Sequence, residues 1–235
     1  MIPFRDHNPS GTAPLVTVGL ILVNVLAFVV ELEQGENLGH FIKEYGLTPG
    51  RVFPTAEPGT SPYEYSVPVV VTFLTSMFLH GGWMHLIGNM WYLWIFGDNV
   101  EDRMGHTKFL IFYLLCGLGA GLVQAAVQAE LDVPMVGASG AIAGVLGAYM
   151  VAFPRARVST LVFLGFVATV VELPALFLLG FWFLLQFVSG MGSMTLAETG
   201  GVAWWAHMGG FVLGMLLLWV FQKPQPKRRV YVYGR

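Results

Sequence analysis

The long apolar runs of this sequence constrain its fold more than any other feature. The first, residues 14–32, reads PLVTVGLILVNVLAFVVEL and contains one charged residue. About 20 apolar residues are enough for a helix to cross the hydrocarbon core of a bilayer. The whole chain is 55% hydrophobic and only 11% charged, whereas about a quarter of the residues of a soluble domain are charged. The sequence therefore predicts an all-α protein whose main partner is the lipid bilayer.

Hydropathy divides the chain into two tails and a membrane domain. The tails are residues 1–13 and 222–235, and residues 14–221 form the domain. Its six candidate spans are residues 14–32, 83–100, 109–128, 139–152, 173–188 and 204–221. A long polar first loop runs from Glu33 to about His80. We interpret the apolar run from Val158 to Val171 as a cytoplasmic interfacial or re-entrant segment.

Basic residues predict the orientation of these spans. They cluster after span two, after span four and in the C-terminal tail: Arg103, Lys108, Arg155, Arg157, Lys223, Lys227, Arg228, Arg229 and Arg235. Since positive connections stay in the cytoplasm, we expect both termini inside and the first loop outside. The short tails, without an organelle-type presequence, favour a prokaryotic plasma (inner) membrane. A net charge of -2 with no basic face argues against nucleic acid as a partner.

Four polar residues are expected at similar depth below the outer surface. Ser139 opens span four, and His207 lies in the first turn of span six. His85 and Asn89, four residues apart in span two, share one helix face. Because polar groups are costly within a bilayer, these side chains should face the bundle interior or a water-filled cavity.

This set has the chemistry of a serine hydrolase. A serine hydroxyl becomes a nucleophile when a histidine accepts its proton. The Asn89 amide, a His85 ring N–H and the Ser139 backbone N–H are candidate donors to an oxyanion. Small residues on spans four and six would let the two helices approach closely: Gly140, Gly144, Gly147, Ala148, Gly210 and Gly214. No carboxylate is expected at the depth of His207, so the sequence favours a dyad over a triad.

Each of these residues also has a structural interpretation. Ser139 alone could be a packing residue or a helix N-cap. His85 and Asn89 could be interhelical hydrogen-bonding groups, and His207 an interfacial histidine. The four positions at one depth on three spans favour a site. The single cysteine, Cys116, has no metal-ligand spacing around it, and we expect no metal.

Three motifs, in order, resemble the signature of the rhomboid intramembrane serine proteases: HGGWMHLIGNMWYLWIFGDNVEDRMG, GASGAIAGVLGAY and AHMGGFVLG. The resemblance covers nearly the whole chain. It implies a six-helix bundle with a long first outer loop, an active-site cavity that opens outward, and no cofactor. It also implies Ser139 as nucleophile, His207 as base, and His85, Asn89 and the Ser139 amide as the oxyanion hole.

The resemblance further implies supporting roles for Gly137, Gly140, Gly210 and His80, the last in ordering the first loop. Two features of some members are missing. The first loop has no Trp-Arg pair, and Ala143 replaces a tyrosine that stacks on the catalytic histidine.

We therefore expect an endopeptidase that cleaves transmembrane segments of membrane-protein substrates near the outer face. The alternative is a catalytically silent rhomboid-like factor that binds membrane proteins, although such relatives have lost the serine or the histidine. A transporter should show paired broken helices or mid-membrane charges, and neither is evident. The sequence does not predict an oligomeric state.

Overall fold

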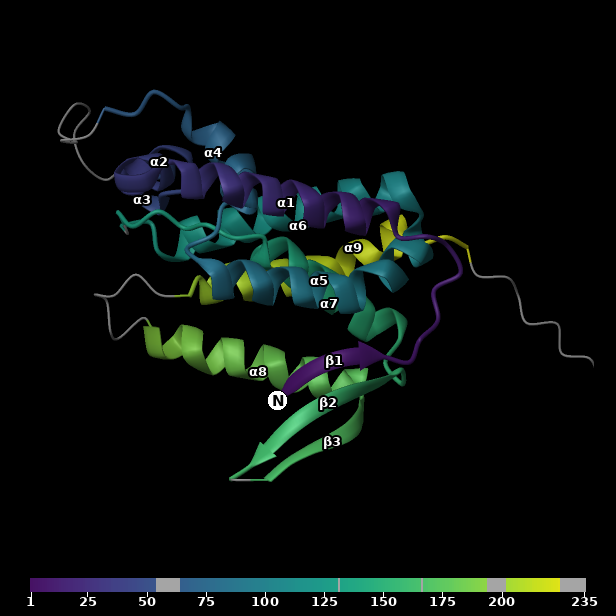
Figure 1. Cartoon of the computed structure of the whole chain (residues 1–235). Helices are drawn as coiled ribbons and strands as arrows, with labels where there is room; N and C mark the ends of the chain where they lie inside the picture. The colour runs from purple at the N-terminus through teal and green to yellow at the C-terminus, as the bar shows by residue number, and fades with distance from the viewer. Residues whose placement is uncertain (54–63, 131, 166, 194–201, 225–235) are drawn as a thin grey trace, which may run out of the picture.

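The computed structural model describes residues 1–53, 64–130, 132–165, 167–193 and 202–224. Its main body is a bundle of long helices that run roughly along one axis (Figure 1). These helices are α1 (Leu15–Glu33), α5 (Trp83–Met104), α6 (His106–Val127), α7 (Ser139–Ala152), α8 (Ala175–Ser193) and α9 (Trp204–Phe221). The predicted all-α membrane bundle is confirmed.

Length and hydropathy identify four helices within the described residues that can cross a membrane: α1, α6, α8 and α9. A bent pair that includes α5 would be a fifth, and α7 is apolar but shorter. The multi-pass character of the protein is thus established, and the count of six spans stays a prediction.

Successive long helices alternate in direction, which places the starts of three of them at one end of the bundle. Helices α5, α7 and α9 all begin at the end that carries α2 (Leu38–Tyr45) and α3 (Pro49–Val52), on the left in Figure 1. We call this the α2–α3 end. Side chains in the first turns of α5, α7 and α9 are therefore neighbours.

Helix α7 occupies the centre of the bundle, where it contacts α5, α6, α8 and α9. Its closest neighbour is α9, because glycines face each other across the interface. A Cβ atom on Gly210 would collide with the carbonyl oxygen of Gly140, and one on Gly214 with that of Gly144. Small residues here let the two backbones touch, as is usual for tightly packed membrane helices.

The described part of the first loop contains short helices. Besides α2 and α3 it includes α4 (Val69–Thr75), which continues through a 3-10 turn to Phe78 and meets α5 at a bend of 80°. Leu47 pairs with Met135, which precedes α7, in an isolated antiparallel bridge. The loop is thereby attached to the segment that leads into Ser139.

The run from Val158 to Val171, which we interpret as a cytoplasmic interfacial or re-entrant segment, contributes strands that the sequence analysis did not predict. It lies in a β-hairpin of β2 (Arg157–Leu164) and β3 (Val167–Pro174), with Gly165 at the turn in a left-handed conformation (φ 62°). Its many β-branched residues favour strands. Hydropathy alone does not separate such a strand from an apolar helix.

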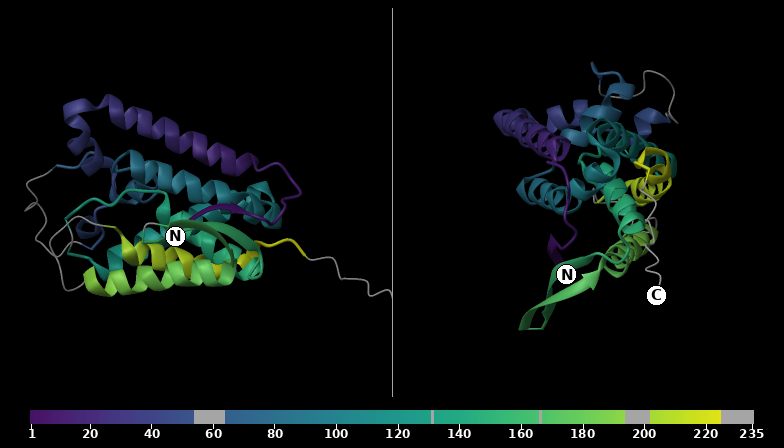
Figure 2. Two further views of the ribbon diagram at one scale, coloured as in Figure 1. Left: turned by 60° about the horizontal axis from the view of Figure 1, so that its bottom comes forward. Right: turned by 90° about the vertical axis from the view of Figure 1, so that its right-hand side faces the viewer.

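The N-terminal tail supplies the third strand, β1 (Ile2–Asp6), and the order in the sheet is β1-β2-β3. The hairpin projects from the bundle beside α8 (Figures 1 and 2). Side-chain hydrogen bonds attach β1 to the bundle. The Tyr149 hydroxyl donates to Asp6 Oδ2 over 2.6 Å, and Trp91 Nε1 donates to the Pro3 carbonyl over 2.6 Å. Much of the predicted C-terminal basic tail lies outside the described residues.

Candidate active site

Ser139 is the first residue of α7, and Gly137, two residues before it, has no room for a side chain. Gly137 has φ 130°, and a Cβ atom there would lie 2.8 Å from the His85 ring. The Gly137 N–H donates to the Ser76 carbonyl over 2.8 Å, which fixes the approach to the helix. The Ser139 backbone N–H lies at a helix N-terminus, where it has no partner within its own helix.

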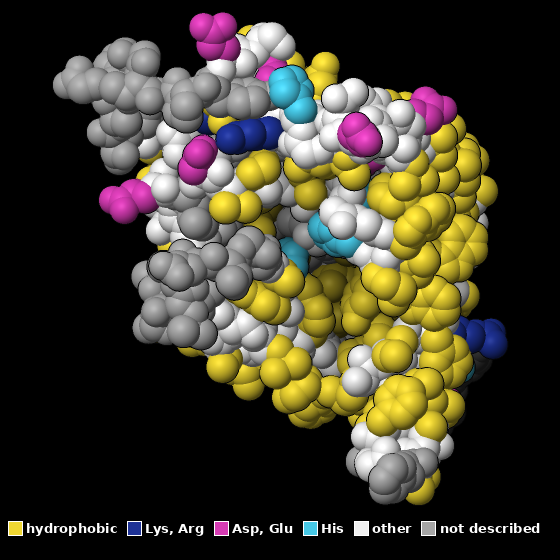
Figure 3. Space-filling view, turned by 60° about the vertical axis from the view of Figure 1, so that its left-hand side comes forward, with side chains coloured by type: hydrophobic (Ala, Val, Ile, Leu, Met, Phe, Trp, Pro, Cys, Tyr) yellow, Lys and Arg dark blue, Asp and Glu magenta, His cyan; other side chains and the backbone are white. Residues whose placement is uncertain are grey.

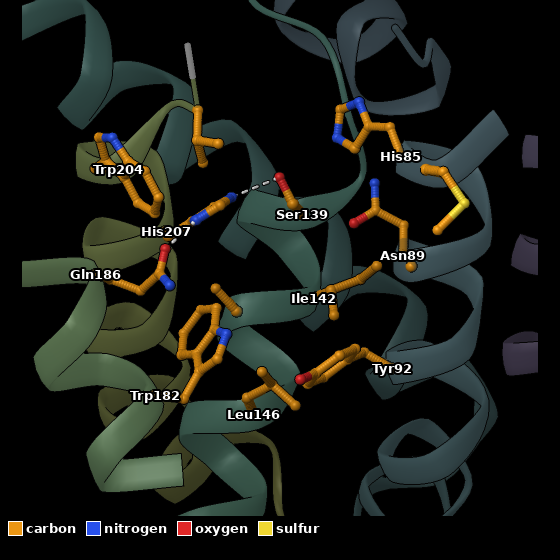
Figure 4. Close-up of a pocket in the computed structure, with 14 residues that line it drawn as sticks. His85, Asn89, Tyr92, Ser139, Ile142, Leu146, Trp182, Gln186, Trp204 and His207 are labelled. Carbon is orange, nitrogen blue, oxygen red and sulfur yellow. Dashed lines mark hydrogen bonds between the residues drawn. The ribbon is translucent and has the colours of Figure 1, made fainter. Parts of the chain in front are cut away.

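His207 lies in the first turn of α9 and reaches Ser139 directly. Its Nε2 atom is 2.8 Å from Ser139 Oγ (Figure 4). This contact requires the close approach of α7 and α9 that their glycines permit. The start of α9 is also anchored from α6, since the Ala206 N–H donates to Gln124 Oε1 over 3.0 Å.

Two side chains of α8 contact the His207 ring on the side away from Ser139. Gln186 Oε1 is 2.6 Å from His207 Nδ1, and the Trp182 ring lies 5.8 Å from the imidazole between centroids, with the planes at 35°. Trp204 approaches edge-on at 6.3 Å. Ala143 has no ring to offer. Sequence reasoning missed Gln186 and Trp182, although an amide inside the apolar run WFLLQF was a usable signal.

His85 and Asn89 lie one turn apart on α5 and face Ser139 across the cavity (Figure 4). The Gly81 N–H donates to His85 Nδ1 over 3.3 Å. In a neutral ring the proton must then be on Nε2, which makes Nε2 a donor. Asn89 Nδ2 is buried, and no atom of the described residues accepts a hydrogen bond from it. A buried donor without an acceptor is costly unless a ligand supplies one.

These residues line a cavity of about 260 Å³. Its walls come from α5, α7, α8, α9 and the residues just before α9: Met84, His85, Gly88, Asn89, Tyr92, Ser139, Ile142, Ala143, Leu146, Trp182, Gln186, Val202, Trp204 and His207. At the α2–α3 end the surface is hollowed, with histidines at the rim and hydrophobic side chains inside (Figure 3). The cavity brings a hydroxyl, an imidazole and N–H donors together above an apolar floor.

His80 lies beside this group. Its backbone N–H donates to both carboxylate oxygens of Glu31, over 3.0 and 3.1 Å, and its ring packs against His85 at 5.1 Å. Glu31, which sequence reasoning did not select, therefore ties α1 to the turn before α5. No group of three or more His, Cys, Asp or Glu residues in the described part of the chain could hold a metal ion.

Comparison with known protein families shows to which family this chain belongs. Residues 68–224, about two thirds of the chain, match the rhomboid domain. The chain belongs to the rhomboid family. The match includes all four residues of the Ser139, His207, His85 and Asn89 group. The rhomboid family is a family of intramembrane proteases.

Individual relatives agree with this membership. "Rhomboid protein 1, mitochondrial" of Saccharomyces cerevisiae is 28% identical over 173 residues, 70% of this chain and 46% of its own length. "Rhomboid-like protein 11, chloroplastic" of Arabidopsis thaliana is 40% identical over 80 residues, 34% of this chain and 28% of its own. "RHOMBOID-like protein 1" of the same plant is 24% identical over 232 residues, which cover 93% of this chain and 55% of the relative's own length. The chain thus spans about half or less of these rhomboid relatives.

Proposed function

We propose that this rhomboid is an intramembrane serine endopeptidase with a Ser139–His207 dyad. The observation that carries the proposal is the contact of 2.8 Å between Ser139 Oγ and His207 Nε2 at the wall of the cavity. A positioned imidazole is the usual activator of a serine hydroxyl. The silent alternative would leave a nucleophile and a base in hydrogen-bonding contact without use.

The proposed reaction proceeds through an acyl-enzyme. Ser139 Oγ attacks the carbonyl carbon of the scissile peptide while its proton moves to His207 Nε2. The carbonyl oxygen becomes an oxyanion, which Asn89 Nδ2, His85 Nε2–H and the Ser139 backbone N–H would stabilise. The intermediate collapses, the C–N bond breaks, and His207 gives its proton to the departing amine. Water then hydrolyses the ester by the same proton transfers.

The proposed substrates are transmembrane segments of other membrane proteins. Backbone carbonyls in a helix are hydrogen-bonded, so the scissile segment must unwind before attack. We expect preference for helix-weakening residues such as Gly or Pro near the outer end of the substrate span, and for a small residue before the cut. Replacing the weak positions with leucines should abolish cleavage, and undiminished cleavage would contradict this view of the substrate.

The proposed location is a plasma (inner) membrane, with residues 1–13 and 222–235 in the cytoplasm. The cavity would then open at the outer face, because the starts of α5, α7 and α9 lie at the end away from the basic connections.

The test is cleavage of a tagged transmembrane reporter coexpressed with wild type, Ser139→Ala or His207→Ala. Each substitution should reduce cleavage by about 10³-fold or more, because the two side chains act as one unit. Ser189→Ala is the matched control: this serine lies on α8 outside the cavity wall and its loss should leave cleavage unchanged. Persistent cleavage by Ser139→Ala would overturn the proposal, and a wild type that binds the reporter without cutting it would favour the silent alternative.

A further inference from the structure

A serine–histidine dyad works only if the imidazole carries its proton on the correct nitrogen. For His207 Nε2 to accept the Ser139 proton, the neutral ring must be protonated at Nδ1. In serine hydrolases with a triad, a carboxylate that accepts from Nδ1 imposes this tautomer and fixes the ring. Here the group that faces Nδ1 is the amide of Gln186.

Geometry gives Gln186 the same capability. Its Oε1 atom lies 2.6 Å from His207 Nδ1, and the two side chains are each 8% exposed. An amide oxygen accepts hydrogen bonds and cannot donate one. With oxygen at this place, the shared proton must be on Nδ1, which leaves the Nε2 lone pair directed at Ser139 Oγ, 2.8 Å away.

We propose that Gln186 is the positioning residue of this dyad, holding His207 in the Nδ1–H tautomer as a neutral substitute for a carboxylate. The inference rests on the proposed function of Ser139 and His207. Gln186 acts through His207, and its amide makes no bond to the reacting carbonyl.

The bilayer gives a physical reason for an amide at this place. An ionised carboxylate at membrane depth is costly, and burial of a charge is recovered only with excellent pairing. An amide provides the acceptor without a formal charge. The hydrogen bond from His207 to this amide also depends on a fixed imidazole orientation. Trp182, one turn before Gln186 on α8, packs on the His207 ring with the two planes at 35°.

The orienting contacts of His207 therefore come from one face of α8. Residues 182 and 186 are four apart, so their side chains lie above one another on the helix. On α7, where a ring would have to come from position 143, the side chain is only a methyl group. The ring contact that Ala143 cannot provide to His207 comes instead from Trp182 of α8.

The experiment compares Gln186→Leu with Gln186→Glu in the full chain, purified in detergent. Leucine has similar size but no acceptor, whereas glutamate keeps an oxygen at the end of a side chain of the same length. Gln34→Leu is the matched control, because the Gln34 side chain donates to the Val30 carbonyl of α1 and lies outside the cavity wall. The readouts are kcat and KM on a transmembrane reporter, the rate of fluorophosphonate labelling, and thermal stability.

We expect Gln186→Leu to lower both kcat and the labelling rate by about 10- to 100-fold, the effect of one lost buried hydrogen bond. KM should change by less than about threefold, since ground-state binding is not what the amide supports. Gln186→Glu should recover most of the labelling rate, and Gln34→Leu should match wild type. Wild-type labelling by Gln186→Leu, or equal losses in the leucine and glutamate variants at unchanged stability, would overturn the proposal.

A measurement on the unsubstituted protein keeps the proposal testable if Gln186→Leu does not fold. The ¹⁵N NMR shifts of the histidine rings report which nitrogen carries the proton, and the His207 signals are those lost in His207→Ala. We expect His207 protonated on Nδ1, and a ring protonated on Nε2 would overturn the assignment. This result is independent of cleavage by Ser139→Ala, so failure of the dyad and failure of its positioning are distinguishable.

Discussion

At the scale of single residues, the most informative atom is Asn89 Nδ2, a donor buried beside Ser139 without an acceptor among the described residues. The proposed role of this atom as an oxyanion donor predicts that Asn89→Ala lowers kcat by about 10²–10³-fold with little change in KM. Reporter kinetics in detergent measure this. Asn24→Ala is the control, since Asn24 donates to the Leu20 carbonyl of its own helix. An Asn89→Ala enzyme with wild-type kcat would remove Asn89 from the mechanism.

Sequence reasoning reached part of the site at this scale. The spacing of His85 and Asn89 and the depth of Ser139 and His207 follow from helix periodicity, and the structure brings these four side chains around one cavity. Their catalytic roles stay predictions. Gln186, Trp182 and Glu31 were missed because their partners depend on how α8 and α1 rotate against their neighbours, which periodicity in one helix does not specify.

At the scale of elements, the contact between α7 and α9 controls the site. Gly214→Ala should force the backbones apart, because the added Cβ meets the Gly144 carbonyl. We expect a loss of stability of about 1–3 kcal/mol and a loss of cleavage, seen by thermal unfolding and by reporter assay. Gly19→Ala on α1 is the control, since a Cβ there meets nothing within 4 Å. Equal behaviour of the two variants would show that this interface tolerates separation.

Hydropathy predicted the apolar helices but not the strands. Residues 139–152 and 204–221 were placed as spans, and α7 and α9 cover these residues. The two strands before α8 were not predicted. Long apolar helices have a strong signal, whereas an apolar hairpin depends on pairing with a distant strand, here β1, which no local pattern reveals.

At the scale of the whole molecule, orientation in the bilayer is the open prediction. In a Cys116→Ala background, Glu36→Cys lies near α2 and Arg155→Cys follows α7 at the opposite end; both side chains are exposed. An impermeant maleimide should label Glu36→Cys on intact cells and Arg155→Cys only after permeabilisation, because basic connections stay inside. The reverse pattern would place the cavity on the cytoplasmic side.

The proposed function depends on Ser139 being an activated nucleophile. The most direct measurement is mass spectrometry of the protein in lipid bilayers after reaction with a fluorophosphonate, which bonds covalently to a serine oxygen made nucleophilic by a base. We expect one adduct, on the peptide that contains Ser139, and none in His207→Ala. An unmodified Ser139, or an adduct that forms equally well without His207, would contradict it.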